Sequence, residues 1–210
     1  MAENANAKVI EEFRGVSDVV IAQITANTST DLTYGEVMPL CGVAELSKET
    51  STSQETHYYD NSAALVISGE GEDKLTLKTS AVPLDKLALI TGRHYDANLD
   101  ALIECEREQR YFAVGYKTGL VGSDTEHNRY VWRYVCQFDI PKESFKTKDN
   151  NATAEGQELT LTAIHTIKKF EIDGKQKSVK ATVVKEGKAD LSTFFDKVVL
   201  PGELTAKAAV

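Results

Sequence analysis

The sequence contains four histidines and three cysteines, the residue types that most often hold metals or act as nucleophiles. The histidines stand apart in unlike contexts, with no HExxH pair and no second ligand at helical or hairpin spacing, so no metal site is predicted. The cysteines form no CxxC pattern, and none stands beside a histidine as a nucleophile pair would. We interpret them as buried apolar thiols of a reducing compartment. The residues concerned are His57, His94, His127, His165, Cys41, Cys105 and Cys136.

Other signatures of catalysis or cofactor binding are missing from the sequence as well. There is no Gly-x-Ser-x-Gly elbow. The Gly69-Glu70-Gly71 stretch is too short for a phosphate-binding loop and lacks the Lys-Ser/Thr that would follow it. No nucleophile, base and orienting group can be assembled, so the sequence predicts a protein that is not an enzyme and uses no cofactor.

Three glutamates alternate in one short stretch of the chain. Glu104, Glu106 and Glu108 would share one face if this segment were extended. Paired carboxylates can carry out acid–base chemistry. The interleaved Arg107 and Arg110 are more typical of a solvated hairpin. A third interpretation is an acidic patch that faces an enclosed channel.

Aromatic residues gather in two segments that are expected to be neighbouring strands, residues 111–116 and 130–138. In the second segment Tyr130, Trp132, Tyr134, Cys136 and Phe138 have the same parity, so a straight strand would place them on one face. Such a stripe could stack on bases or sugars. Cross-strand packing in the core of a sandwich is the alternative interpretation.

Charge and composition restrict the classes of partner. The formal net charge of −8 disfavours nucleic-acid binding, which needs Lys and Arg against phosphates, although an acidic protein can stay near DNA without holding it. There is no apolar run of 18 residues, so no membrane contact is expected, and the first six residues do not form a signal peptide. The 210 residues are expected to form a single domain, with the hydrophobic residues needed for a core.

Alternation of apolar and polar residues dominates the chain and predicts a mainly β fold. Turn signals at residues 71–73 (GED) and 173–175 (DGK) each predict a hairpin. One segment, residues 83–92, has helical spacing, with proline first, glycine last and Leu84, Leu87 and Ala88 on one face. Residues 191–196 predict a short turn. Strands are predicted at residues 19–25, 65–69, 75–79, 111–117, 130–138, 159–165 and 179–184.

The polar stretch of residues 47–56, followed by His57-Tyr58-Tyr59-Asp60-Asn61, is unusual in being rich in threonine and lacking core residues. It predicts a long strand that is polar on both faces and leads to an exposed loop. An unpaired strand edge recruits other chains, which is a liability in a monomer and useful in a subunit that assembles. An ordinary surface hairpin is the alternative.

The order of these segments resembles the major tail protein family, the tail tube proteins of long-tailed siphophages. The resemblance begins with residues 15–22 and 32–37 (LTYGEV), continues with the Thr/Ser strand that ends in Tyr58-Tyr59-Asp60-Asn61, and includes the helix that starts at Pro83. It ends with residues 111–116, 129–134 and 145–148, and it covers roughly residues 14–186.

This resemblance implies a β-sandwich or barrel of two antiparallel sheets with one flanking α-helix. It also implies hexameric rings that stack into a tube, through which genomic DNA leaves the head without specific binding. An acidic lumen, for which Glu104, Glu106 and Glu108 are candidates, would repel phosphate. The implied partners are further copies of the chain, the tape measure protein, the tail terminator and the baseplate or distal tail proteins. The implied location is the tail tube of the virion, after synthesis in the bacterial host cytoplasm.

Stacking of rings requires segments that reach a neighbouring copy. The expected segments are the polar arm (residues 47–63) and the N-terminal arm (residues 1–15). Residues 187–210 are expected to form a C-terminal arm. A binding module for a carbohydrate or a protein, and the tube protein of a phage-derived contractile particle, are the alternative functions. The candidate self-assembly residues are Lys48, Glu49, Glu55, Tyr58, Tyr59, Asp60, Asn61, Phe13 and Arg14.

Overall fold

The fold is mainly antiparallel β-sheet with one short helix, as predicted. The computed structural model describes residues 10–122, 126–143, 145, 147 and 156–207. The helix α1 (Leu84–Thr91) lies between β5 and β6. The strands are β1 (Glu11–Asn27), β2 (Leu32–Tyr34), β3 (Met38–Pro39), β4 (Val43–Tyr59), β5 (Ser62–Thr79), β6 (His94–Asp96), β7 (Ala101–Ile103), β8 (Phe112–Gly122), β9 (Glu126–Phe138), β10 (Gln157–Ile164), β11 (Lys169–Ile172), β12 (Lys175–Ser178) and β13 (Ala181–Lys185).

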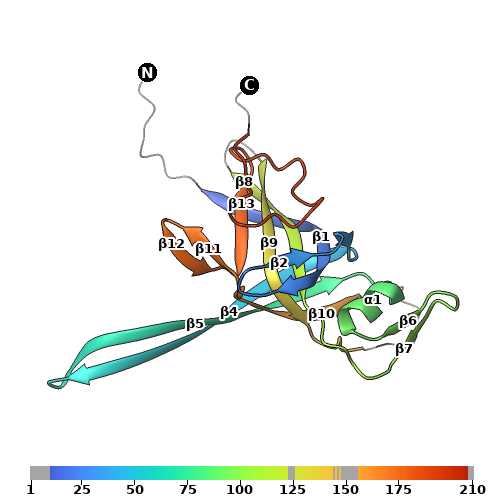
Figure 1. Cartoon of the computed structure of the whole chain (residues 1–210), viewed down its shortest axis with the longest axis horizontal. Helices are drawn as coiled ribbons and strands as arrows, with labels where there is room; N and C mark the ends of the chain where they lie inside the picture. Colours follow the sequence, from blue (N-terminus) through green and yellow to red (C-terminus); the bar gives the residue numbers. More distant parts are fainter. Residues whose placement is uncertain (1–9, 123–125, 144, 146, 148–155, 208–210) are drawn as a thin grey trace.

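One large sheet contains nine of the strands, in the order β2-β1-β8-β9-β10-β5-β4, with β13 also paired to β9 and β3 to β1. The long strand β9 divides this sheet, because its residues 135–138 pair with β10 and its residues 129–133 pair with β13. Figure 1 shows β4, β5 and β10 running across the direction of β8, β9 and β13. Over the described residues β2 and β4, at the two ends of the sheet, do not pair with each other, so the fold is an open sandwich rather than a closed barrel.

Two hydrophobic clusters lie against the central strands β8 and β9, which are buried along most of their shared length. The first cluster joins β8 and β9 to β5, β10 and α1, through residues such as Leu77, Leu161 and Ile90. The second joins them to the segment after β13, through Phe194 and Val198. The central strands therefore carry apolar residues on both faces, which explains why alternation is weak there.

The aromatic stripe of β9 is part of the core and does not form a platform. Trp132 and Tyr134 are fully buried in the second cluster, where the Trp132 Nε1–H donates to the carbonyl of Phe194 at 2.9 Å. Cys136 and Phe138 lie in the first cluster instead. The expectation of one continuous face is wrong because the register between β8 and β9 shifts, so that two residues of β9 lie opposite one residue of β8.

The helix α1 agrees with its predicted bounds. Pro83 precedes it, and Gly92 ends it in the left-handed region with a φ of 70°. A Cβ at Gly92 would lie 1.8 Å from the carbonyl oxygen of Glu108, so only glycine fits there. The predicted apolar face is partly wrong, because Leu84 is 43 % exposed and the buried residues of the helix are Ala88, Ile90 and Thr91.

The two predicted terminal arms differ from expectation. Residues 11–14 belong to β1 and pair with residues 119–122 of β8, so they are not an arm, and residues 1–9 lie outside the described residues. Of the C-terminal arm, residues 187–207 include the predicted short turn and fold over the second cluster. This segment covers the core through Phe194, Val198 and Val199, while residues 208–210 lie outside the described residues.

Of the two predicted hairpin turns, one is confirmed and one is wrong. Asp173 and Gly174, with φ values of 53° and 69°, connect β11 to β12. Residues 71–73 form no turn, because β5 continues through them. Gly71 and Glu72 lie opposite the single residue Ser51, between the pairs Thr50↔Asp73 and Thr52↔Glu70, and thus form a β-bulge.

Candidate assembly surface

The longest hairpin of the molecule consists of β4 and β5, paired from Val43↔Thr79 to Tyr59↔Ser62. Asp60 and Asn61 form its turn with φ values of 50° and 59°. Two consecutive positive φ values are typical of a type I′ turn, and Asp and Asn tolerate them better than other residues with a Cβ. The predicted polar arm is therefore one strand of a long hairpin.

The outer part of this hairpin has no neighbouring strand among the described residues. β10 pairs with β5 only as far as Ala163↔Asp73, and residues 62–70 of β5 pair with β4 alone. Figure 1 shows this part of β4 and β5 extending far from the body. Both edges of the projecting ladder therefore offer backbone N–H and C=O groups to another chain.

Large apolar side chains lie uncovered at the outer end, which we call the hairpin tip (residues 54–68). Tyr58 and Tyr59 are 69 % and 63 % exposed, and Leu65, Val66 and Ile67 are 51 %, 56 % and 52 % exposed. Successive residues of a strand point to opposite faces, so these side chains expose apolar surface on both faces of the ladder. Exposed apolar surface of this kind is typical of interaction sites in soluble proteins. The predicted candidates Glu55, Asp60 and Asn61 are exposed in the same region, and Glu49 is exposed nearer the body.

A buried ionic network holds the hairpin where it leaves the body. Asp73 is 4 % exposed, and its carboxylate accepts hydrogen bonds from Arg133 Nη1 at 2.6 Å and Lys180 Nζ at 3.0 Å. Thr50 Oγ1 on β4 donates to the same carboxylate at 2.9 Å, and Lys180 also donates to the carbonyl of Gly71 at 3.0 Å. We call Asp73, Arg133, Lys180 and Thr50 the root network. It joins both strands of the hairpin to β9 and to the start of β13.

The predicted candidate Lys48 lies beside this network, with its Nζ 3.7 Å from Asp73 Oδ2. The two buried cations have further partners. Arg133 Nε donates to the Tyr116 hydroxyl at 3.2 Å, and Lys180 forms an ion pair with Glu70. Each buried charge therefore faces an opposite charge, as burial requires.

The root network keeps its charges over a wide pH range. Burial alone would raise the pKa of Asp73, but hydrogen bonds from Lys180, Thr50 and Arg133 outweigh burial and hold this pKa below its usual value. Burial also opposes the charge of Lys180, and its bonds to Glu70 and Asp73 outweigh that effect and raise its pKa. The network is thus fully ionised at neutral pH.

The remaining assembly candidates, Phe13 and Arg14, lie near the start of β1 and do not belong to the β4–β5 hairpin. Arg14 forms an exposed ion pair with Glu126 at 3.3 Å. Phe13 is 67 % exposed, and the guanidinium of Arg129 lies 5.1 Å from its ring centroid. The structure does not bring these two residues together with Tyr58 and Tyr59, but it places Phe13 and Lys48 in one groove.

This groove, the β1–β4 groove, has a volume of about 590 Å³ and lies between β1 and β4. Tyr116 and Val131 are buried at its base, and Phe13 and Val183 are exposed beside it. Among the described residues β4 pairs only with β5, and residues 11–17 of β1 pair only with β8. The strands that border the groove therefore also have free edges. Its apolar lining is Phe13, Val16, Leu46, Tyr116, Val131 and Val183.

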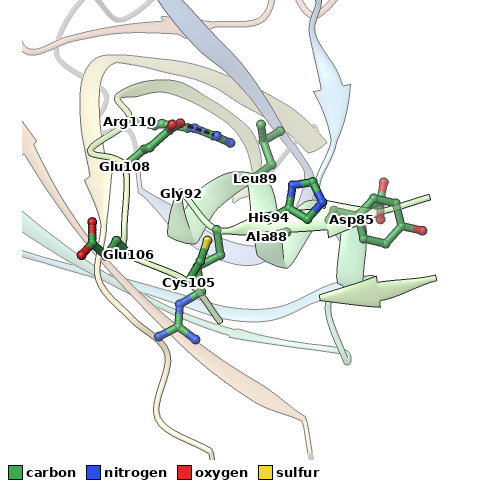
Figure 2. A pocket seen from close by; sticks show the side chains of 11 residues that line it. Asp85, Ala88, Leu89, Gly92, His94, Cys105, Glu106, Glu108 and Arg110 are labelled. Atoms are coloured by element: carbon green, nitrogen blue, oxygen red, sulfur yellow. Dashed lines mark hydrogen bonds and ion pairs between the residues drawn. The ribbon is translucent and has the colours of Figure 1, made fainter. Parts of the chain in front are cut away.

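The three alternating glutamates do not form a strand, because β7 ends at Ile103 and residues 104–111 are irregular. Glu104 forms an ion pair with Arg93, and Glu108 forms one with Arg110 at 2.8 Å. Glu106 and Glu108 line a pocket of about 380 Å³ beside the end of α1. Figure 2 shows Glu108 turned toward Arg110 while Glu106 points elsewhere. The shared acidic face expected of an extended segment is therefore wrong, and two of the three charges are paired.

The described residues contain no group of three or more His, Cys, Asp or Glu placed to hold a metal ion. The cysteines form no disulfide; Cys136 is buried, but Cys105 is exposed, contrary to expectation. No helix in the described part of the chain is long and apolar enough to cross a membrane. The chain matches no known protein-family model, and no curated protein matches it.

Sequence reasoning missed two sets of residues of this candidate surface. The sequence predicts Leu65, Val66 and Ile67 in a hairpin with its turn at residues 71–73, but in the structure they lie opposite polar residues of β4. Pairing residues 47–56 with this segment, around the Asp60-Asn61 turn, would have revealed their exposure. No local sequence pattern indicates that Asp73 contacts Arg133 and Lys180. Arg133 is 60 residues from Asp73 along the chain, and Lys180 is 107 residues from it.

Proposed function

We propose that this chain is the structural subunit of a phage tail tube, in which hexameric rings stack around a channel for DNA. The observation that carries the proposal is the projecting β4–β5 hairpin with Tyr58, Tyr59, Leu65, Val66 and Ile67 more than half exposed. Water-exposed apolar surface of this kind is stabilised when another chain covers it. In a homopolymer, further copies of the same chain can cover this surface.

The free strand edges support the same function. A heterologous contact, in which one surface of a copy binds a different surface of the next, closes into a ring or continues as a filament. Strand edges can add backbone hydrogen bonds to such a contact. The 17-residue strand β4, an end strand of the large sheet, offers the longest edge.

Charge is compatible with a channel that releases DNA without holding it. The net charge of −8 is repeated in every copy of an assembly, so phosphates meet repulsion and not a binding site. Glu104, Glu106 and Glu108 remain candidates for the lumen, with Glu106 the one whose charge has no ion pair among the described contacts. The tape measure protein, tail terminator and baseplate proteins are proposed partners on the resemblance alone.

The alternative of a binding module that stacks sugars or bases on the β9 aromatics is less well supported, because only Tyr130 of this stripe is partly exposed. Trp132, Tyr134 and Phe138 are each 0 % exposed, so no ligand can reach their rings. A binding module would have to use another surface, and the exposed apolar residues of the hairpin tip are better matched to a protein partner.

Electron microscopy of the purified protein tests the proposal. Negative-stain images are expected to show rings or tubes of uniform width, with a mass per ring of six chains by mass photometry or analytical ultracentrifugation. A monodisperse monomer at every salt and protein concentration would overturn the proposal.

A shortened hairpin provides the matched control. Replacing residues 54–68 by Asn-Gly joins Ser53 to Gly69, which already face each other in the ladder, through a two-residue turn. The root network stays intact in this variant. We expect a folded protein that forms no tubes, and normal tubes from this variant would show that the hairpin is not the assembly element.

A further inference from the structure

The β1–β4 groove and the hairpin tip are two uncovered apolar surfaces on the same chain. The groove exposes Phe13 by 67 % and Val183 by 52 %, and the tip exposes the tyrosines and aliphatic residues described above. Contact between two such surfaces is favourable, because each would bury apolar area of the other away from water.

The charges of the two surfaces are complementary as well. Residues 54–68 contain Glu55 and Asp60 and neither lysine nor arginine. The groove is lined by Lys48, Arg129 and Arg133, and its one carboxylate, Glu45, is neutralised by Lys78 at 2.7 Å. The Arg133 side chain is only 7 % exposed, whereas that of Lys48 is 40 % exposed although its Nζ lies near Asp73. Lys48 and Arg129 are therefore the cations that an incoming acidic segment would meet.

The tip cannot reach the groove of its own chain. Lys48 lines the groove, and Tyr58 lies ten positions farther along the same paired strand. A strand advances about 3.3 Å per residue, so Tyr58 lies about 30 Å from Lys48 along the hairpin. Folding back would break the ladder between β4 and β5. Only a second copy can bring its tip to this groove.

We infer that the tip of the β4–β5 hairpin of one copy docks in the β1–β4 groove of the next copy. This inference rests on the proposed assembly and names its receiving surface. The apolar side chains of the tip cover Phe13 and Val183, Glu55 or Asp60 approaches Lys48 and Arg129, and the free edges of β1 and β4 accept backbone hydrogen bonds. Because donor and acceptor surfaces differ, each added copy presents a new tip and a new groove, and the contact propagates.

Cross-linking between two different variants tests the contact directly. One protein carries Asn61→Cys at the tip and the other carries Thr118→Cys in the groove, both with the exposed Cys105 replaced by Ser. After the two are mixed under assembly conditions, a short bis-maleimide is expected to give a covalent dimer with one copy of each. A matched control carries Gln176→Cys, an exposed position on the β11–β12 hairpin, in place of the groove cysteine.

The outcomes separate this inference from the proposed function. Tubes with a tip–groove dimer and little control dimer support both. Tubes in which the tip links to Gln176→Cys as well as to Thr118→Cys, or to neither, overturn the docking site and leave the tube function standing. Absence of any assembly overturns both.

A substitution in the groove supplies a second measurement. Val183→Asp places a negative charge where an acidic tip must dock, and it is expected to raise the critical concentration for assembly about ten-fold. Ile103→Asp, at a site 49 % exposed on β7 and outside the groove, is the control and should change it less than about two-fold. Equal effects of the two substitutions would overturn the assignment.

Deletion of residues 1–9 tests whether this segment, and not the hairpin tip, occupies the groove. If this segment covered the groove of its own chain, the deletion would speed the reaction of Thr118→Cys with a monofunctional maleimide in the unassembled protein. We expect an unchanged rate, and a clear increase would replace the hairpin tip by residues 1–9 as the occupant.

Discussion

The inner part of β5 (residues 73–79) and its outer part (residues 62–70) both carry large aliphatic residues two positions apart, but the surroundings of these residues differ. In the inner part Leu75 and Leu77 are both 0 % exposed, whereas in the outer part Leu65 and Ile67 are 51 % and 52 % exposed. Both parts pair with β4 through the same kind of ladder. The difference is that β10 joins β5 only up to Asp73, and the first hydrophobic cluster lies under the inner part alone.

This contrast shows that strand pairing does not by itself require a core. An isolated two-stranded hairpin is marginally stable in water, so the outer part depends on the anchored inner part and on whatever covers it. The border between the two parts coincides with the bulge at Gly71 and Glu72 and with the root network. The same strand thus contributes to folding on one side of Asp73 and, in our proposal, to assembly on the other.

The largest effect is expected in the inner part of the strand. Leu77→Ala removes a fully buried side chain from the first cluster and should lower the free energy of unfolding by about 4 kcal/mol, the transfer term plus the cavity left behind. Urea denaturation followed by tryptophan fluorescence measures this change, because Trp132 is buried in the body. A loss below about 1 kcal/mol would mean that the inner part is no better anchored than the outer part.

The border between the two parts is tested by Asp73→Asn. The amide keeps the shape and can still accept from Thr50, but it leaves the charges of Arg133 and Lys180 without their shared carboxylate. Breaking a buried ionic network from one side costs about 3 kcal/mol. Glu72→Gln, at the neighbouring exposed position, is the matched control and should cost less than about 0.5 kcal/mol. Equal losses in the two variants would show that the root network does not hold the hairpin.

The pH dependence of the Asp73→Asn effect tests whether the root network is ionised as assigned. The folded state lowers the pKa of Asp73, so the stability that its charge contributes is present above the unfolded pKa of about 3.9 and is lost as the pH falls through the folded pKa. The folded state raises the pKa of Lys180, so its contribution is complete below about 10.4 and is lost as the pH rises through the folded pKa. The difference in unfolding free energy between wild type and Asp73→Asn should therefore be constant from about pH 5 to 9 and shrink below about pH 4. Urea titrations across this range check it; a difference that already shrinks near pH 6 would contradict the assigned ionisation.

The contrast within β5 also marks how far sequence reasoning extends. Local patterns were sufficient for the β class, for α1 with its terminal Gly92, and for the turn at Asp173 and Gly174. They failed at residues 71–73, whose turn-forming composition is overruled by pairing with β4 and by the Asp73 contacts to Lys180 and Arg133. Those partners come from other strands of the sheet, so no local window contains them. Exposure of Leu65 and Ile67 was hidden for the same reason, since the LxI pattern is the same whether or not another layer covers it.

The smallest effect on stability is expected in the outer part of the strand. Ile67→Ser at the tip removes a side chain that is 52 % exposed and lies opposite Glu55, so the free energy of unfolding of the monomer should change by less than about 0.5 kcal/mol. In the proposed assembly the same substitution removes an apolar contact from every interface, and the critical concentration should rise about ten-fold. Gln54→Ser, an exposed polar position on the facing strand, is the control and should leave both quantities unchanged. Sedimentation velocity over a concentration series, with urea denaturation on the same samples, separates the two effects. A loss of monomer stability comparable to that of Leu77→Ala would show that a layer of the folded chain already covers the outer part of β5, and the distinction between the two halves of the strand would then be lost.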